Sequence, residues 1–142
     1  MSKVFDQQHY DQDDNAKYEL IGWLRYKGFK AWVNPDQYGI DVLASKDSKR
    51  YQFEVEVKHN WDTQGFPFDT VHWSARKLKF AEPNRYTWFV MFSNDRSQAL
   101  FAPGEAVLQA ECVQKNTKYT QGEWFVALPV ARCMFRQMKE AW

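Results

Sequence analysis

The stretch GIDVLASKDSKRYQFEVEVK, residues 39–58, contains two apolar segments joined by a polar turn. The segments, Ile40–Ala44 and Tyr51–Lys58, predict the two strands of an antiparallel hairpin. Successive side chains of a strand point to opposite faces, so the second strand has a buried apolar face and a charged face. The apolar face holds Phe53, Val55 and Val57, and the charged face holds Glu54, Glu56 and Lys58.

The charged residues of this hairpin are candidates for catalytic or ligand-binding residues. Removing a charged side chain from water costs free energy, so several on one strand face indicate a function. Asp41 heads the first strand and Glu56 lies on the second, so we expect both carboxylates to face one cleft. Together with the backbone carbonyl of Val57 they supply the oxygen ligands that Mg²⁺ prefers, with Mn²⁺ as a substitute. Lys58 lies on the Glu56 face, where its ammonium is expected to orient or deprotonate an attacking water. This pattern predicts metal-dependent hydrolysis of a phosphodiester.

The rest of the chain predicts helices and strands around the hairpin. A helix is expected from Asp14 or Asn15 to Lys27, with Gly28 as its stop, after a flexible acidic segment over residues 1–13. Glu19 on this helix is expected to add an outer carboxylate to the cleft. The other predicted strands are Phe29–Val33, Tyr86–Phe92, Gln98–Ala102, Cys112–Tyr119 and Trp124–Val130, and the other predicted helices are Thr70–Ala81, Pro103–Ala110 and Ala131–Trp142. This order predicts a single domain over residues 14–142, of α/β class, with a mixed sheet flanked by helices.

The amino-acid composition indicates which kinds of molecule this protein could bind. Aromatic residues make up 18% of the 142 residues and include seven Trp, which suits either a core rich in large rings or a surface that stacks on bases. The net charge is only +1, but residues 1–14 carry −3 and the remaining chain +4. A basic surface beside carboxylates reserved for metal is compatible with DNA as the partner.

Cysteine and histidine content excludes several other classes of protein. Cys112 and Cys133 show no close pairing and no secretory segment precedes them, so we expect a cytoplasmic location. The three histidines and two cysteines do not form a zinc spacing. No apolar run reaches membrane-spanning length, and no glycine-rich phosphate loop indicates a nucleotide cofactor.

Gly39-Ile40-Asp41, followed after a hairpin by Glu56-Val57-Lys58 and preceded by a helix with Glu19, resembles the PD-(D/E)XK nuclease superfamily, which includes restriction endonucleases and Holliday-junction resolvases. The resemblance covers roughly residues 14–92. It implies a restriction-endonuclease-like αβββαβ core and Mg²⁺-dependent endonuclease activity on DNA. It also implies metal ligation by Asp41 and Glu56 and a catalytic role for Lys58.

The resemblance extends to the substrate-contacting surface. In nucleases of this type the helix after the lysine strand borders the cleft, which implies that Arg76 and Lys77 contact the DNA backbone. A domain of this size has little surface for sequence recognition, so the resemblance favours either a homodimer or selectivity for DNA structure.

Two alternatives stay open. The first alternative concerns the metal ligand: Asp36, which follows Pro35 in the turn before the first strand, is the ligand in place of Asp41. The charged strand face, with Glu54 exposed to solvent, is otherwise an ordinary sheet surface with weak cross-strand pairs. In that case the chain is a non-catalytic module that binds nucleic acid or protein on the same fold.

Overall fold

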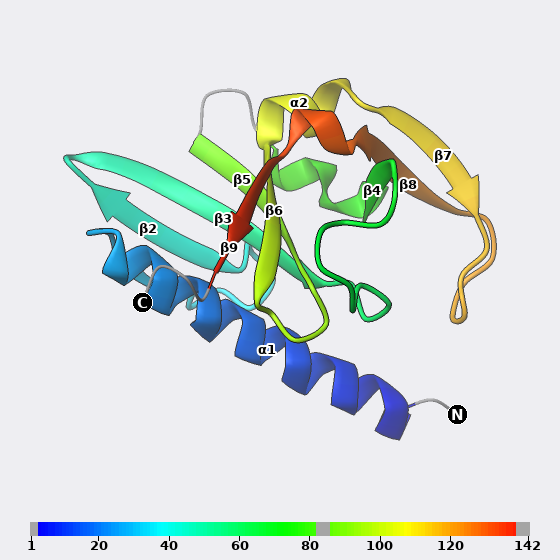
Figure 1. The fold of residues 1–142 in the computed structure, drawn as a ribbon, viewed down its shortest axis with the longest axis horizontal. Coiled ribbons are helices and arrows are strands. Elements are labelled where there is room, and N and C mark those ends of the chain that lie inside the picture. Colours follow the sequence, from blue (N-terminus) through cyan, green and yellow to red (C-terminus); the bar gives the residue numbers. More distant parts are fainter. Residues whose placement is uncertain (1–2, 82–85, 139–142) are drawn as a thin grey trace.

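The structure, a computed structural model, describes residues 3–81 and 86–138 (Figure 1). Its first helix, α1 (Lys3–Tyr26), is followed by nine strands, a short helix and two 3₁₀ turns. These are β1 (Lys30–Val33), β2 (Val42–Lys46), β3 (Lys49–Val57), β4 (Thr70–Ser74), η1 (Ala75–Phe80), β5 (Tyr86–Phe92), β6 (Gln98–Pro103), α2 (Gly104–Gln109), β7 (Glu111–Lys115), β8 (Glu123–Pro129), η2 (Val130–Arg132) and β9 (Met134–Gln137). None of the helices in the described part of the chain is long and apolar enough to cross a membrane.

Helix α1 ends where the sequence predicts but begins earlier. Gly28 has a φ of +94°, its N–H donates to the Arg25 carbonyl, and the Phe29 N–H donates to the Leu24 carbonyl. This glycine conformation closes the helix as expected. The predicted start at Asp14 or Asn15 is wrong, because the helix already begins at Lys3.

The central sheet is mixed, as predicted. Sheet A has the order β1-β2-β3-β5-β6-β9, in which only β3 and β5 run parallel. The predicted hairpin forms β2 and β3, and the apolar segment Tyr86–Phe92 becomes β5 beside it. Phe53, Val55 and Val57 face α1 and are buried, which confirms the predicted face.

The connection from β3 to β5 differs from the prediction. A helix over Thr70–Ala81 was expected, but residues 70–74 form β4 and only Ala75–Phe80 make a 3₁₀ turn. Buried Val71 and Trp73 alternate with the half-buried Thr70 and His72, which is the period of a strand. A partner strand, β8, satisfies the backbone of β4. The expected αβββαβ order is therefore kept with a strand and a 3₁₀ turn at the position of its second helix.

A second sheet, sheet B, forms from β4-β8-β7. The predicted pairing of the segments at 112–119 and 124–130 is confirmed by the antiparallel β7–β8 pair. The predicted terminal helix over Ala131–Trp142 is wrong within the described residues, because Met134–Gln137 pair with β6 as β9. Residues 139–142 of that prediction lie outside the part of the chain that the structure describes.

Sheet A separates two apolar cores. One lies between sheet A and α1, and the other lies between sheet A and sheet B and includes Trp61, Trp73 and Phe89. Glu54 pairs in register with Phe89, and Glu56 with Met91, so the charged face of β3 looks toward the sheet B side. The β2–β3 hairpin projects beyond sheet B, on the opposite side of the molecule from β7 (Figure 1). The carboxylates of Asp41, Glu54 and Glu56 lie toward the end of the hairpin away from its polar turn.

Candidate active site

Asp41 is held in place at the entry to β2. Its Oδ2 atom accepts a hydrogen bond of 2.8 Å from the backbone N–H of Val55 on β3. Its Oδ1 atom lies 3.4 Å from the Nζ atom of Lys17 on α1. The side chain is 18% exposed, so it is fixed by the hairpin and still reachable from solvent.

The alternative carboxylate, Asp36, lies in the turn before β2. Its Oδ1 atom accepts a hydrogen bond from the backbone N–H of Tyr38, and the residue is exposed. This is the geometry of a turn-stabilising aspartate. Asp41, by contrast, lies beside the carboxylates of β3.

Glu54 is the buried member of the carboxylate group. Val42 pairs with Phe53 in the antiparallel hairpin, so Asp41 comes opposite Glu54. Glu54 is 5% exposed, and one of its carboxylate oxygens, Oε1, has no hydrogen-bond partner among the described residues. Burial, the largest cause, and the nearby Asp41 carboxylate together raise the pKa of Glu54 to about 7, against the opposing effect of the Lys77 ammonium. The sequence-based expectation that Glu54 is exposed is wrong.

Lys77 supplies the ammonium of this group. It reaches the site from η1, and its Nζ atom lies 3.0 Å from Oε2 of Glu54 and 2.5 Å from Oε1 of Glu56. Burial alone would lower the pKa of Lys77, but the carboxylates of Glu56 and Glu54 outweigh it and raise that pKa. The contacts of Lys77 are thus with the carboxylates, and its predicted contact with the DNA backbone stays a prediction.

Lys58, the ammonium predicted from the sequence, lies at the end of β3. Its backbone N–H donates to the Phe92 carbonyl, and its Nζ atom lies 4.8 Å from the centre of the Phe68 ring. Burial and the nearby Lys115 ammonium lower the pKa of Lys58, and Glu56 opposes them. Lys58 is therefore near Glu56 but directed toward the loop that contains Phe68.

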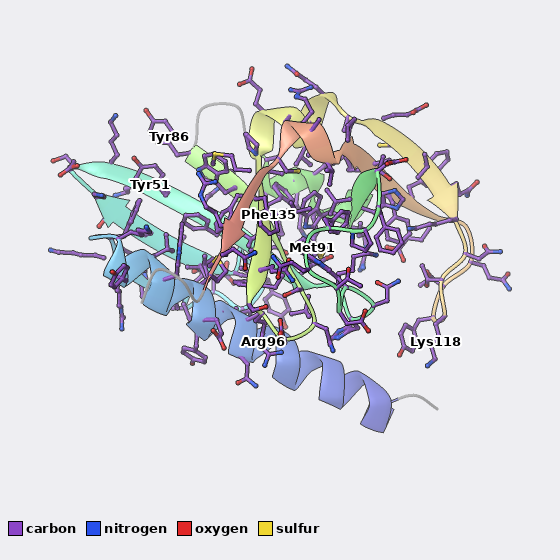
Figure 2. The ribbon with its side chains drawn as sticks, in the orientation of Figure 1. Tyr51, Tyr86, Met91, Arg96, Lys118 and Phe135 are labelled. Atoms are coloured by element: carbon purple, nitrogen blue, oxygen red, sulfur yellow. The ribbon has the colours of Figure 1, made fainter. Side chains whose placement is uncertain are left out.

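The contacts given for the other predicted site residues lie outside the carboxylate group. Glu19 on α1 lies 3.9 Å from Nε of Arg96, which Figure 2 shows beside that helix. Arg76 pairs with Glu123 at 3.7 Å and its Nε atom donates to Oγ of Ser74, so its contacts are with sheet B. Its side chain is 81% exposed, and its predicted contact with the DNA backbone stays a prediction.

The residues present suit a divalent cation in their chemistry. Among residues 3–81 and 86–138, no group of three or more His, Cys, Asp or Glu side chains is arranged as a metal site. However, the Lys77 ammonium lies where a cation would balance Glu54 and Glu56, and the buried Oε1 atom of Glu54 lacks a partner. An all-oxygen set of carboxylates beside a backbone carbonyl is the donor set of Mg²⁺ or Mn²⁺.

Comparison with solved structures finds the same architecture in Hjc, a Holliday junction resolvase from the archaeal hyperthermophile Archaeoglobus fulgidus. The TM-score is 0.53 and the match covers 83% of this chain and 96% of that chain. The fold is resolvase-like. At 12% sequence identity, the likeness establishes a mixed α/β fold of the restriction-endonuclease-like kind. No protein-family model matches the sequence, and neither does any curated protein.

The sequence pattern identified the hairpin of the site but did not show that Glu54 is buried or that Lys77 contacts the carboxylates. Glu54 could have been found by counting the register from the polar turn, which sets Asp41 opposite residue 54. Nothing in the local sequence indicated the contacts of Lys77 with Glu54 and Glu56, because they depend on the 3₁₀ turn that replaces the predicted helix.

Proposed function

We propose that this protein is a metal-dependent nuclease that cleaves phosphodiester bonds of DNA. The observation that carries the proposal is the meeting of Asp41, Glu54, Glu56 and Lys77 at one end of the β2–β3 hairpin, in a resolvase-like fold. Structural ion pairs seldom leave a buried carboxylate oxygen without a partner.

In this proposal the oxygen ligands of the ion are the carboxylates of Asp41, Glu54 and Glu56, with the Val57 carbonyl as a further candidate. A bound Mg²⁺ or Mn²⁺ supplies charge neutralisation at the phosphoryl oxygens and a water of lowered pKa. Asp41 is oriented for this role by the Val55 N–H, which fixes one of its oxygens.

The part of Lys77 follows from its position. With no phosphate present, its ammonium balances Glu54 and Glu56. When a phosphodiester enters, the same ammonium is within reach to donate a hydrogen bond to a phosphoryl oxygen or to orient the attacking water. Lys58, predicted from the sequence, is the second candidate for this role, and Glu19 and Arg76 stay sequence-based candidates.

The alternative reading is a non-catalytic module on the same fold. One observation favours it: Lys77 already neutralises two of the carboxylates, as a purely structural ion-pair cluster would. This reading predicts binding of nucleic acid or protein without cleavage.

The test is cleavage of a panel that comprises plasmid, linear duplex, single strand and four-way junction, with Mg²⁺, Mn²⁺ or EDTA. The wild type is expected to cleave at least one substrate with a divalent ion and none in EDTA. Asp41→Asn is expected to lose activity, and Asp36→Asn, in the exposed turn, is expected to keep it. A folded wild type that cleaves nothing would establish the non-catalytic reading.

A further inference from the structure

A groove of about 610 Å³ lies along the part of sheet A that projects beyond sheet B. Its lining includes Trp32 of the edge strand β1, the cations Lys49 and Arg50 of the β2–β3 hairpin, Gln52 of β3 and Tyr86 of β5. Two of its rings are open to solvent, since Trp32 is 42% and Tyr86 54% exposed. Among the described residues, no carboxylate lines it. The groove is therefore basic and aromatic.

The groove begins beside the carboxylates. Gln52 and Glu54 are two residues apart on one strand, so their side chains point to the same face about 7 Å apart. The amide of Gln52 donates to Oγ1 of Thr87 and to the carbonyl of Phe80, the last residue of η1. Lys77 belongs to the same turn. A polymer bound at Glu54 and Lys77 would therefore reach the groove within about one repeat of its backbone.

The side chains of the groove fit nucleotides better than a peptide or a second protein. Trp32 lies on the Gln52 face, in register with Leu43, which in turn pairs with Gln52. An exposed tryptophan on such a surface offers a flat ring to a base. Tyr86 on β5 pairs in register with Tyr51, and its ring lies 5.2 Å from the Tyr51 ring, on the face of sheet A opposite to Trp32. Figure 2 shows the two tyrosines side by side. A cationic side chain beside an exposed aromatic ring suits a nucleic-acid strand, because each of its bases is linked to a phosphate.

We propose that this groove binds an unpaired segment of the DNA strand whose phosphodiester meets the carboxylates. A base stacks on Trp32, and a flanking phosphate pairs with Arg50, which lies on the same face as Gln52. The inference rests on the proposed nuclease function and adds a substrate class to it. Because a duplex keeps its bases stacked on one another, the groove selects branched or flapped DNA over uninterrupted duplex.

The experiment measures binding of a fluorescein-labelled single strand and of a matched duplex by fluorescence anisotropy, in EDTA so that nothing is cleaved. Trp32→Ala is expected to weaken binding of the single strand about tenfold, the loss that follows from removing one base-stacking ring. Trp32→Phe keeps a ring and is expected to restore most of the affinity. Trp124→Ala is the matched control, because Trp124 is 52% exposed but lies on β8 of sheet B.

Arg50→Ala tests the phosphate contacts. It is expected to weaken binding and to reduce the slope of log Kd against log salt concentration by about one, the value for one lost phosphate contact. Duplex affinity is expected to change much less than single-strand affinity in both variants. Equal losses for the two DNAs, or a loss in Trp124→Ala as large as in Trp32→Ala, would overturn the proposal.

The groove and the nuclease proposal fail in different ways. A protein that cleaves DNA with metal but binds the single strand equally well after Trp32→Ala lacks this groove function. A protein that never cleaves, yet loses single-strand affinity in Trp32→Ala, keeps the groove and is not a nuclease. If Trp32→Ala changes only the sedimentation of the protein, the groove is a contact between copies of the chain and the proposal is wrong.

Discussion

Lys77 joins two carboxylates that would repel each other inside the protein. Its Nζ atom contacts Glu54 and Glu56, while Asp41 approaches Glu54 from the neighbouring strand. Removing one partner of a buried ion pair is strongly destabilising, because it leaves charge uncompensated. The Lys77 ammonium balances the charge of Glu54 and Glu56. A bound divalent cation would balance the same carboxylates and would leave Lys77 able to contact a phosphate.

Elsewhere, the half-buried thiol of Cys133 gives a pH-dependent prediction. Burial raises the pKa of Cys133 to about 11, with Arg132 opposing, whereas Cys112 is exposed. Since the thiolate is the nucleophile, Ellman's reagent at pH 8 is expected to label Cys112 quickly and Cys133 slowly. A raised pKa means that the folded state holds this proton more tightly than the unfolded state. The contribution to stability is therefore complete below pH 9 and is lost as the pH rises through about 11.

The check is the Cys112→Ser variant, in which Cys133 is the only thiol. Its labelling rate is expected to rise about tenfold per pH unit from pH 7 to 10. Labelling at pH 8 as fast as that of an unfolded sample would contradict the half-buried position and raised pKa of Cys133.

For the site residues, the sequence predicted correctly those features that follow from the alternation of side chains along a single strand. Alternation along β3 correctly separated Phe53 and Val55 from the charged face. It could not show that Glu54 is buried, because that depends on η1 and sheet B covering part of the face. Whether a charged side chain is buried depends on its tertiary neighbours, and the alternation of residues along one strand gives no information about them.

At the scale of elements, the crossover between β3 and β5 differs most from the prediction. Parallel strands need a long connection, commonly a helix, which favoured the helical reading of residues 70–81. The structure makes that connection with β4 and η1 instead. β4 is stable because it pairs with β8, more than fifty residues later in the chain. Such distant pairings also turn the tail into β9, and local sequence gives no indication of either.

Two tryptophans of the second core give an element-scale prediction. Trp61, after β3, and Trp73, on β4, are both fully buried. The indole N–H of Trp61 donates to the Gly65 carbonyl at 2.9 Å, whereas that of Trp73 has no partner among the described residues. Trp61→Phe is therefore expected to lower the free energy of unfolding by about 1 kcal/mol more than Trp73→Phe.

Urea unfolding of the two variants measures this difference. The ring-to-ring replacement removes similar apolar volume at both positions, so the comparison isolates the hydrogen bond. Equal slopes against urea would show that the surface exposed on unfolding is unchanged. A larger loss for Trp73→Phe than for Trp61→Phe would contradict the described pairing.

At the scale of the whole molecule, sheet A is covered by α1 on one face and only partly by sheet B on the other. The sequence predicted the fold class because a strand hairpin, a preceding helix and an apolar central strand follow from local patterns. It did not predict the extent of sheet B. That extent decides which part of sheet A is left uncovered, and with it the position of the groove beside Trp32.

The proposed nuclease function requires that Asp41, Glu54, Glu56 and Lys77 act as one catalytic group. Single-turnover cleavage of the preferred DNA with Mg²⁺ tests this requirement, with Lys77→Met, Lys77→Arg, Lys58→Met and Lys79→Met compared with wild type. Lys79 is the matched control, since it lies on η1 with its Nζ atom 5.1 Å from the Phe80 ring. Thermal melts establish that each variant is folded.

Lys77→Met is expected to lower the rate at least about a hundredfold, the usual contribution of a positioned acid or base. Lys77→Arg, which keeps the charge, is expected to retain more activity, and Lys79→Met is expected to match wild type. A folded Lys77→Met protein that cleaves at the wild-type rate while Lys58→Met is inactive would contradict the account and assign the ammonium to Lys58.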